Sequence, residues 1–319
     1  MLDSRNPPSF AFALMRFGGT SARQARDMSS LQAAVFVNGT ITRAQDAVVP
    51  VFDHGFLYGE GVYETLRTYR GEPFLFGPHM DRLRRSAGLM ALDVPYTDDQ
   101  MAAHIRDTTR GYTDHFGAVA DTYIRILLTR GVGGLTYNPE ACPAPTLVII
   151  VKPFPAPPEH TFTHGIRVSL VSIRRNHPDA LNPAIKSNNL LNNALAMQEA
   201  LRHGADEALM MNQDGAIVEC SQSNFFIVTQ GRLRTAPLAS GLLPGVTRAW
   251  VIDIARDLGI ETDESDFTPA DVFGADEAFI TGTTREVTPV VAVDTHVIGT
   301  GAPGPLTASL LAEFRRRTG

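Results

Sequence analysis

The segment "KPFPAPPEH" near the middle of the chain holds four prolines in nine residues. Proline fixes φ and lacks a backbone N–H, so this segment can form neither a helix interior nor a central strand. We therefore expect an extended linker over residues 152–159. It separates a small N-terminal domain, residues 31–151, from a larger domain, residues 160–319, and a chain of 319 residues is long enough for two cores.

Residues 1–30 show neither a helical nor a strand period. The first clear strand pattern, "AAVFVNGTI", begins only after Met28. We expect residues 1–30 to form a loose N-terminal extension, as would arise from a start codon chosen too early.

Both halves contain strands joined by two-residue turns, at Asn38-Gly39, Arg70-Gly71 and Asp214-Gly215. Segments with helical spacing follow them, among them "PHMDRLRRSAGLMAL" and "LLNNALAMQEALRHG". Hairpins with helices set against them predict an α+β fold, not a doubly wound parallel sheet.

Composition excludes several classes of protein. A net charge of -6 with dispersed Lys and Arg argues against nucleic-acid binding. No apolar run is long enough for a membrane helix and no secretory leader is evident, so we expect a cytoplasmic protein without a membrane partner. The two cysteines, Cys142 and Cys220, make neither a disulfide framework nor a metal site, and we expect no metal.

Lys186 lies in "NPAIKSNNLLNNALAMQEA", between an Asn-rich loop and a helix that we expect to begin near Asn188 or Asn189. The partial positive charge at a helix N-terminus disfavours an ammonium ion there. A neutral lysine can attack a carbonyl and hold it as a Schiff base. The alternative is an ordinary exposed loop lysine.

Two small-residue turns in the same half are candidate anion sites. In "LLPGVTR", Gly245, Val246 and Thr247 open a helix, where free N–H groups and a hydroxyl suit a phosphate. In "ITGTTRE", a strand ends in Gly282 and Thr283. Each motif alone also fits a plain tight turn. With a Schiff-base lysine, they indicate a phosphorylated aldehyde such as pyridoxal phosphate.

Pyridoxal phosphate works as an electron sink when its ring nitrogen stays protonated, which requires a carboxylate partner. Glu219 alternates with Ile217 along a strand, so both side chains point to one face, which we expect to be the interior. A pyridinium opposite Glu219 would account for a buried carboxylate without a cation. The alternative is a glutamate at the end of a strand, turned to solvent.

These residues lie within motifs that resemble, in order and spacing, those of the fold-type IV (class IV) pyridoxal-phosphate enzymes. The motifs are "VFDHGFLYGEGVYETLR", "HMDRLRRSA", "YIRILLTRGVGG", "KSNNLLNNALAMQEA", "ECSQSNFF", "LLPGVTR" and "TGTTREVTPV". The resemblance runs from about residue 34 to the end. It implies a smaller N-terminal and a larger C-terminal α/β domain with the cofactor between them. It also implies that Lys186 is the Schiff-base lysine, Glu219 the partner of the ring nitrogen, and that the phosphate is bound by Arg82, Val246, Thr247, Gly282 and Thr283.

Substrate recognition has mixed signals. Tyr123 and Arg125 share one strand face and, with Arg67, match the branched-chain aminotransferases. Three features depart from that group. Thr65 stands where the branched-chain enzymes have glycine, and a threonine there is typical of aminodeoxychorismate lyases. Leu191 replaces a tyrosine near the cofactor, and the turn "GTTRE" replaces "GTAAE". The resemblance implies a substrate pocket made by Tyr58, Tyr63, Thr65, Tyr123, Arg125, Thr284 and Arg285.

The function that follows from the resemblance is transamination between an amino acid, first an L-branched-chain one, and a keto acid such as 2-oxoglutarate. The alternatives are a D-amino acid or (R)-amine transaminase, an aminodeoxychorismate lyase and, outside these enzymes, a phosphate-binding module without catalysis. The family also implies at least a homodimer, in which the loop around Tyr58 and residues 131–137 close the other subunit's pocket.

Overall fold

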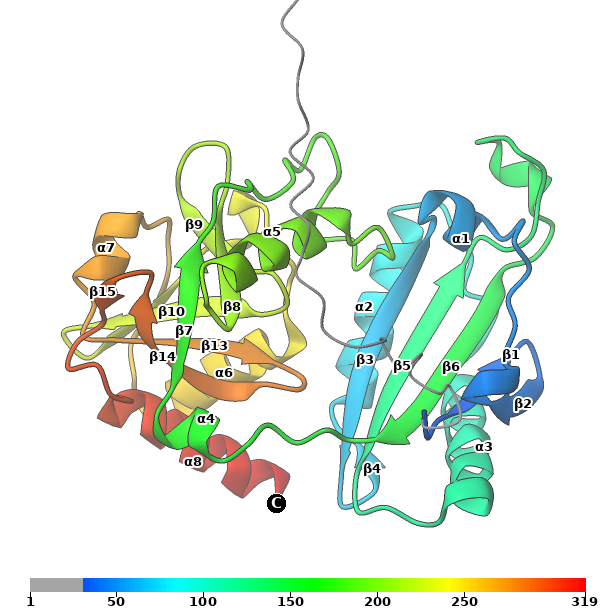
Figure 1. The fold of residues 1–319 in the computed structure, drawn as a ribbon, viewed down its shortest axis with the longest axis horizontal. Helices are drawn as coiled ribbons and strands as arrows, with labels where there is room; N and C mark the ends of the chain where they lie inside the picture. The colour runs from blue at the N-terminus through cyan, green and yellow to red at the C-terminus, as the bar shows by residue number, and fades with distance from the viewer. Residues whose placement is uncertain (1–30) are drawn as a thin grey trace, which may run out of the picture.

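The computed structural model describes residues 31–319, which form two domains, each built on its own sheet (Figure 1). The two-domain α+β fold expected from the sequence is confirmed. The expectation for residues 1–30 lies outside the described residues. The connection between the sheets runs from β6 to α4 (His160–Thr163), and β6 includes Lys152 and Pro153, the first two residues of the predicted linker. The domain limits themselves stay a prediction.

The small domain has a six-stranded antiparallel sheet in the order β2-β1-β6-β5-β3-β4. Two helices pack against it, α2 along β3 and α3 along β1 and β6. The turns at Asn38-Gly39 and Arg70-Gly71 join β1 to β2 and β3 to β4, and all four residues have positive φ, as two-residue hairpins require. The elements are β1 (Ala34–Val37), β2 (Thr40–Arg43), α1 (His54–Tyr58), β3 (Gly61–Tyr69), β4 (Glu72–Pro73), α2 (Phe76–Gly88), α3 (Asp98–Phe116), β5 (Thr122–Thr129) and β6 (Thr146–Pro153).

The large domain has a nine-stranded sheet in the order β12-β11-β10-β13-β14-β7-β8-β9, with β15 paired to β14. β9 also pairs with β10 through Glu219 and Asn224, so six strands close into a ring. The elements after α4 are β7 (Ile166–Leu170), α5 (Leu191–Arg202), β8 (Glu207–Met211), β9 (Ile217–Cys220), β10 (Asn224–Thr229), β11 (Arg232–Thr235), α6 (Val246–Asp257), β12 (Thr262–Glu264), α7 (Pro269–Phe273), β13 (Glu277–Gly282), β14 (Glu286–Val293), β15 (His296–Val297) and α8 (Pro305–Thr318).

Three apolar clusters stabilise this arrangement. One fills the small domain between its sheet and the helices α2 and α3. A second lies inside the ring of the large domain and under α5, and a third packs α6 and α8 against β10, β13 and β14. Each domain therefore has its own core, and Tyr69 and Phe74 of the small domain also pack against the third cluster.

Two helices begin elsewhere than the sequence predicts. α2 begins at Phe76, two residues before Pro78, the first residue of the predicted helical segment "PHMDRLRRSAGLMAL". α5 begins at Leu191, whereas the sequence favoured a start near Asn188 or Asn189. The residues before Leu191 differ because they pair with the small domain: Asn188 N donates to Gly61 O at 2.8 Å, and Ser187 forms a β-bridge with Val62. Lys186 is thus on a segment that pairs with β3, farther from the N-terminus of α5 than the sequence predicted.

Among the described residues, no helix has the length and apolarity to cross a membrane. Both cysteines are free, and no cluster of potential metal ligands is present within residues 31–319.

Candidate active site

A cavity of about 570 Å³ opens between the two domains, and Lys186 lies on its wall. Backbone bonds to the small domain hold the lysine in place, because Tyr63 N donates to Lys186 O at 2.9 Å and Lys186 N donates to Ser86 Oγ at 3.1 Å. Its Nζ lies 4.4 Å from the ring centroid of Tyr63. The loop that joins the large-domain strand β7 to α5 therefore presents one amine to the interdomain cavity.

Most of the residues expected from the sequence meet at this cavity. Those in its lining are Tyr63, Thr65, Arg82, Tyr123, Arg125, Lys186, Glu219, Val246, Thr247, Gly282, Thr283 and Thr284. They come from β3, α2 and β5 of the small domain and, in the large domain, from the loop before α5, from β9 and α6, and from the end of β13 with the turn that follows it. The structure thus brings together residues that are up to about two hundred positions apart in the chain.

The start of α6 and the β13–β14 turn form one polar end of the cavity. Gly245 is the N-cap of α6, and no side chain among the described residues caps this helix, so N–H groups of its first turn face outward. A Cβ at Gly245 would lie 1.9 Å from Asn224 Oδ1, so only glycine fits there. Nearby, Ser223 Oγ and Thr281 Oγ1 are buried in the cavity wall without a hydrogen-bond partner in the described residues. Free donors of this kind suit an anionic ligand.

Arg82 also reaches this end, but with fewer free donors than expected. Its Nε and Nη2 donate to the two carboxylate oxygens of Glu64 at 2.7 and 2.8 Å, and its Nη1 donates to Pro244 O at 3.0 Å. A guanidinium has five N–H groups, so two remain for a ligand, one on each terminal nitrogen. Glu64 thus occupies the Nε–Nη2 edge of the guanidinium that the resemblance assigned to the phosphate.

Glu219 is buried at the closing pair of the ring, which confirms that its side chain points inward. The expectation that it lacks a cation is wrong, because Arg175 Nε donates to Glu219 Oε1 at 2.7 Å. Leu243 N and Asn224 Nδ2 donate to Oε2 at 3.1 and 3.3 Å. Burial raises the pKa of Glu219, and the Arg175 guanidinium opposes that rise.

Tyr63, Thr65 and Arg125 form the wall that faces Lys186. Thr65 pairs directly with Arg125 across β3 and β5. The Arg125 guanidinium carbon lies 4.1 Å from the Tyr63 ring centroid, and Thr65 Oγ1 lies 3.5 Å from Tyr123 Oη. Burial raises the pKa of Tyr63, but the charges of Lys186 and Arg125 outweigh it, and the pKa is lowered. This wall is electropositive and suits a carboxylate.

Three residues assigned to the pocket region from the sequence lie outside the cavity lining. Arg285 extends toward the fully buried Glu207, with Nη2 at 4.0 Å from Oε2. Leu191 is 65% exposed at the start of α5, and its neighbour Leu190 lines the cavity instead. Tyr58 packs on His54 and Tyr137 of its own chain, with ring centroids 4.9 and 5.0 Å apart.

Sequence reasoning missed the two buried partners Glu64 and Arg175. A signal existed for Glu64, because alternation along "GVYETLR" places it on the same face as Val62 and Leu66, where a carboxylate needs a cation. Arg175 gave no such signal, since it lies in an irregular segment.

The sequence model of the family "Amino-transferase class IV" matches residues 61–293. A protein of Methanocaldococcus jannaschii, provisionally named a branched-chain-amino-acid aminotransferase, is 41% identical over 281 residues, which are 88% of this chain and 95% of that protein. The D-alanine aminotransferase of Listeria monocytogenes is 33% identical and covers 88% of this chain and 94% of its own. Among solved structures, the T.th. branched-chain amino acid aminotransferase with pyridoxamine 5'-phosphate has a TM-score of 0.82 and 30% identity, and the match covers 89% of this chain and 93% of that one.

Proposed function

The chain belongs to the class IV aminotransferases, and from this premise we propose that it is a pyridoxal-phosphate-dependent transaminase whose reactive amine is Lys186. The amino group passes between an amino acid, first an L-branched-chain one, and a keto acid such as 2-oxoglutarate. The observation that carries the proposal is the convergence of Lys186, Glu219 and the anion-binding end on one cavity.

The residues present fit pyridoxal phosphate. The first turn of α6, Thr283 and the two free N–H groups of Arg82 would hold its phosphate, and Glu219 would hold a proton on its ring nitrogen. The unpartnered hydroxyls of Ser223 and Thr281 offer further donors. When bound, the cofactor supplies an aldehyde that condenses with amines and a ring that takes up negative charge.

Lys186 moves the proton in this proposal. Its Nζ would remove the proton from the α-carbon of the substrate. The same Nζ would return a proton to the aldehyde carbon of the cofactor. The Tyr63 ring lies beside this amine, and the Arg125 guanidinium carbon lies 4.1 Å from the centroid of the same ring. Backbone anchoring of residues 186–188 to β3 keeps the amine on the wall of the cavity during these transfers.

Arg125 and Tyr123 position the substrate carboxylate, and Thr284 lies across the cavity from them. The Arg125 guanidinium is planar and presents a fork that matches a carboxylate. A substrate held there presents its α-carbon toward Lys186, so the placement of the carboxylate determines which amino acids react.

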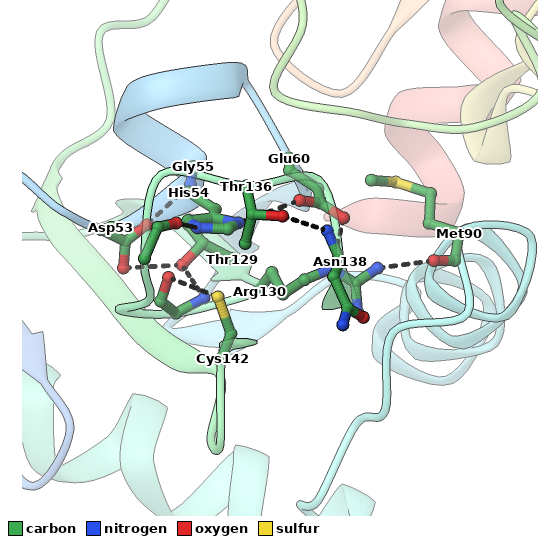
Figure 2. Close-up of polar contacts among 12 residues, drawn as sticks. Asp53, His54, Gly55, Glu60, Met90, Thr129, Arg130, Thr136, Asn138 and Cys142 are labelled. Carbon is green, nitrogen blue, oxygen red and sulfur yellow. Dashed lines mark hydrogen bonds and ion pairs between the residues drawn. The ribbon is translucent and has the colours of Figure 1, made fainter. Parts of the chain in front are cut away.

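A homodimer is part of the proposal, because α1 and residues 131–137 of the small domain expose large apolar side chains. Phe56, Leu135 and Tyr137 are 72%, 71% and 84% exposed, and Tyr58 packs on Tyr137. Figure 2 shows the polar contacts of these two segments, in which Arg130 pairs with Glu60 and donates to Met90 O at 2.7 Å. Because these apolar side chains are exposed in the single chain, we propose that the loop around Tyr58 and residues 131–137 close the pocket of a second copy. A cytoplasmic location stays a prediction.

The test is an amino-transfer assay of the purified chain with cofactor, using L-leucine, D-alanine and (R)-1-phenylethylamine as donors and 2-oxoglutarate or pyruvate as acceptor. We expect L-leucine with 2-oxoglutarate to react fastest. Transfer from D-alanine alone would favour the D-amino acid alternative, which the similarity to the Listeria monocytogenes enzyme supports.

Thr65 supports the lyase alternative, since its hydroxyl lies in the cavity wall where branched-chain enzymes have glycine. Release of pyruvate from aminodeoxychorismate without a keto-acid acceptor would identify a lyase. Keto-acid-dependent transfer without that release would exclude it.

A further inference from the structure

Glu64 is a fully buried carboxylate that the proposed reaction does not use. It lies on β3 between Tyr63 and Thr65, which line the cavity, but its side chain points to the opposite face, toward α2. A buried carboxylate is costly unless it is paired, so its contacts must offset that cost.

Three donors on α2 bind this carboxylate. Arg82 Nε donates to Oε1 at 2.7 Å, Arg82 Nη2 donates to Oε2 at 2.8 Å, and His79 Nδ1 donates to Oε2 at 2.7 Å. His79 and Arg82 are three residues apart and so share one helix face. Burial raises the pKa of Glu64, but the Arg82 guanidinium outweighs it and lowers the pKa to about 2. Burial lowers the pKa of His79, so the ring is a neutral donor at Nδ1.

The orientation of Arg82 follows from these contacts. Glu64 binds the Nε–Nη2 edge of the guanidinium, and Pro244 O accepts from Nη1 at 3.0 Å. Pro244 directly precedes Gly245, the N-cap of α6. The guanidinium is therefore fixed on one edge by β3 and on another by the loop that opens α6, while its remaining N–H groups are available to the cavity.

We propose that Glu64 is a positioning residue, which orients Arg82 so that the two free N–H groups of its guanidinium bind the phosphate of the cofactor. The inference rests on the proposed function. Charge alone would give the opposite effect, because a carboxylate beside Arg82 weakens its attraction for a phosphate. The proposal therefore requires orientation to outweigh charge.

The experiment compares the dissociation constants of pyridoxal phosphate and pyridoxal, for the native chain and for Glu64→Gln. Both ligands carry the same aldehyde and ring, so their ratio isolates the contribution of the phosphate. A hydrogen bond to a charged group contributes about 1.5–3 kcal/mol, so we expect the preference for the phosphorylated ligand to fall at least about tenfold.

A second variant, Glu64→Asp, keeps the charge but is one methylene shorter, and it serves if Glu64→Gln does not fold. We expect its phosphate preference to fall as well, because the guanidinium edge is displaced. Glu60→Gln is the matched control, since Glu60 also pairs with a largely buried arginine, Arg130, but lies outside the cavity lining (Figure 2). Its preference should equal that of the native chain.

A preference that is unchanged in Glu64→Asp, or raised in Glu64→Gln, would overturn the inference. So would an equal fall in Glu60→Gln, because the effect would then come from general loosening. If the native chain binds neither ligand, the proposed function itself fails. If instead the native chain prefers pyridoxal phosphate and both Glu64 variants keep that preference, only the inference about Glu64 fails.

Discussion

Replacing Glu64 by glutamine should remove a pH dependence of stability that the structure assigns to this one carboxylate. The pKa of Glu64 falls from its ordinary value of 4.5 to about 2 in the folded chain, because Arg82 outweighs the effect of burial. A carboxylate with a lowered pKa stabilises the fold above its unfolded pKa. That contribution is lost as the pH falls from about 4.5 toward 2.

The magnitude follows from the two values. At 1.36 kcal/mol per pH unit, the interval between 4.5 and about 2 corresponds to roughly 3 kcal/mol at neutral pH. The Glu64 side chain is fully buried, so solvent screens this interaction little. This contribution to the free energy of unfolding agrees with the roughly 3–5 kcal/mol lost when one partner of a buried ion pair is removed.

The assay is urea unfolding between pH 7 and pH 3.5, followed by the fluorescence of Trp250, the sole tryptophan of the chain. The difference in unfolding free energy between the native chain and Glu64→Gln should be constant above about pH 5.5 and shrink below about pH 4.5. Two curves that stay parallel down to pH 3.5 would refute the reasoning.

Glu313→Gln is the control, because the pKa of Glu313 is also lowered to about 2, through hydrogen bonds from Arg316 and Arg317 on the surface of α8. Raising the salt concentration should weaken the pH dependence that Glu313 contributes and leave that of Glu64 in place.

Three further predictions concern the cavity. Arg175→Met should destabilise the protein by roughly 3–5 kcal/mol in urea unfolding, because Glu219 loses its cation. Adding Glu219→Gln should restore part of that stability, and a double variant whose loss equals the sum of the two single losses would contradict the pairing. Arg125→Met should lower kcat/KM for the keto acid by about tenfold to a hundredfold in steady-state kinetics, while Lys186 still reacts with the cofactor. An unchanged kcat/KM would contradict the role of Arg125 in binding the carboxylate. Arg285→Ala should leave the KM of both substrates within about twofold in the same assay, because its guanidinium faces Glu207 outside the cavity.

The sequence predicted the fold class, and most of the site residues named from it line the cavity, because many of the relevant patterns are local. Turns such as Asn38-Gly39 need positive φ, and Glu219 alternates with Ile217 on a strand, so each is visible in a few residues. The resemblance then supplied Arg82, whose role no local pattern distinguishes.

The errors come from tertiary contacts between distant segments. The sequence near Asn188 and Asn189 resembles the start of a helix, but the pairing of residues 187 and 188 with Val62 and Gly61 delays that start to Leu191. Arg285 looked free to reach the cavity until the fold placed it opposite Glu207. The pairing of Glu219 with Arg175 spans 44 residues and depends on an irregular loop, so no sequence period reveals it.

Covalent mapping of the cofactor tests the central claim directly. The chain has two lysines, Lys186 on the cavity wall and Lys152, whose Nζ lies 5.1 Å from the Tyr123 ring centroid, outside the lining. After borohydride reduction of the protein with pyridoxal phosphate, peptide mass mapping should find the added mass on Lys186. Lys152→Arg should keep the modification and Lys186→Arg should lose it. Modification of Lys152 instead, or transaminase activity of Lys186→Arg equal to that of the native chain, would contradict the account.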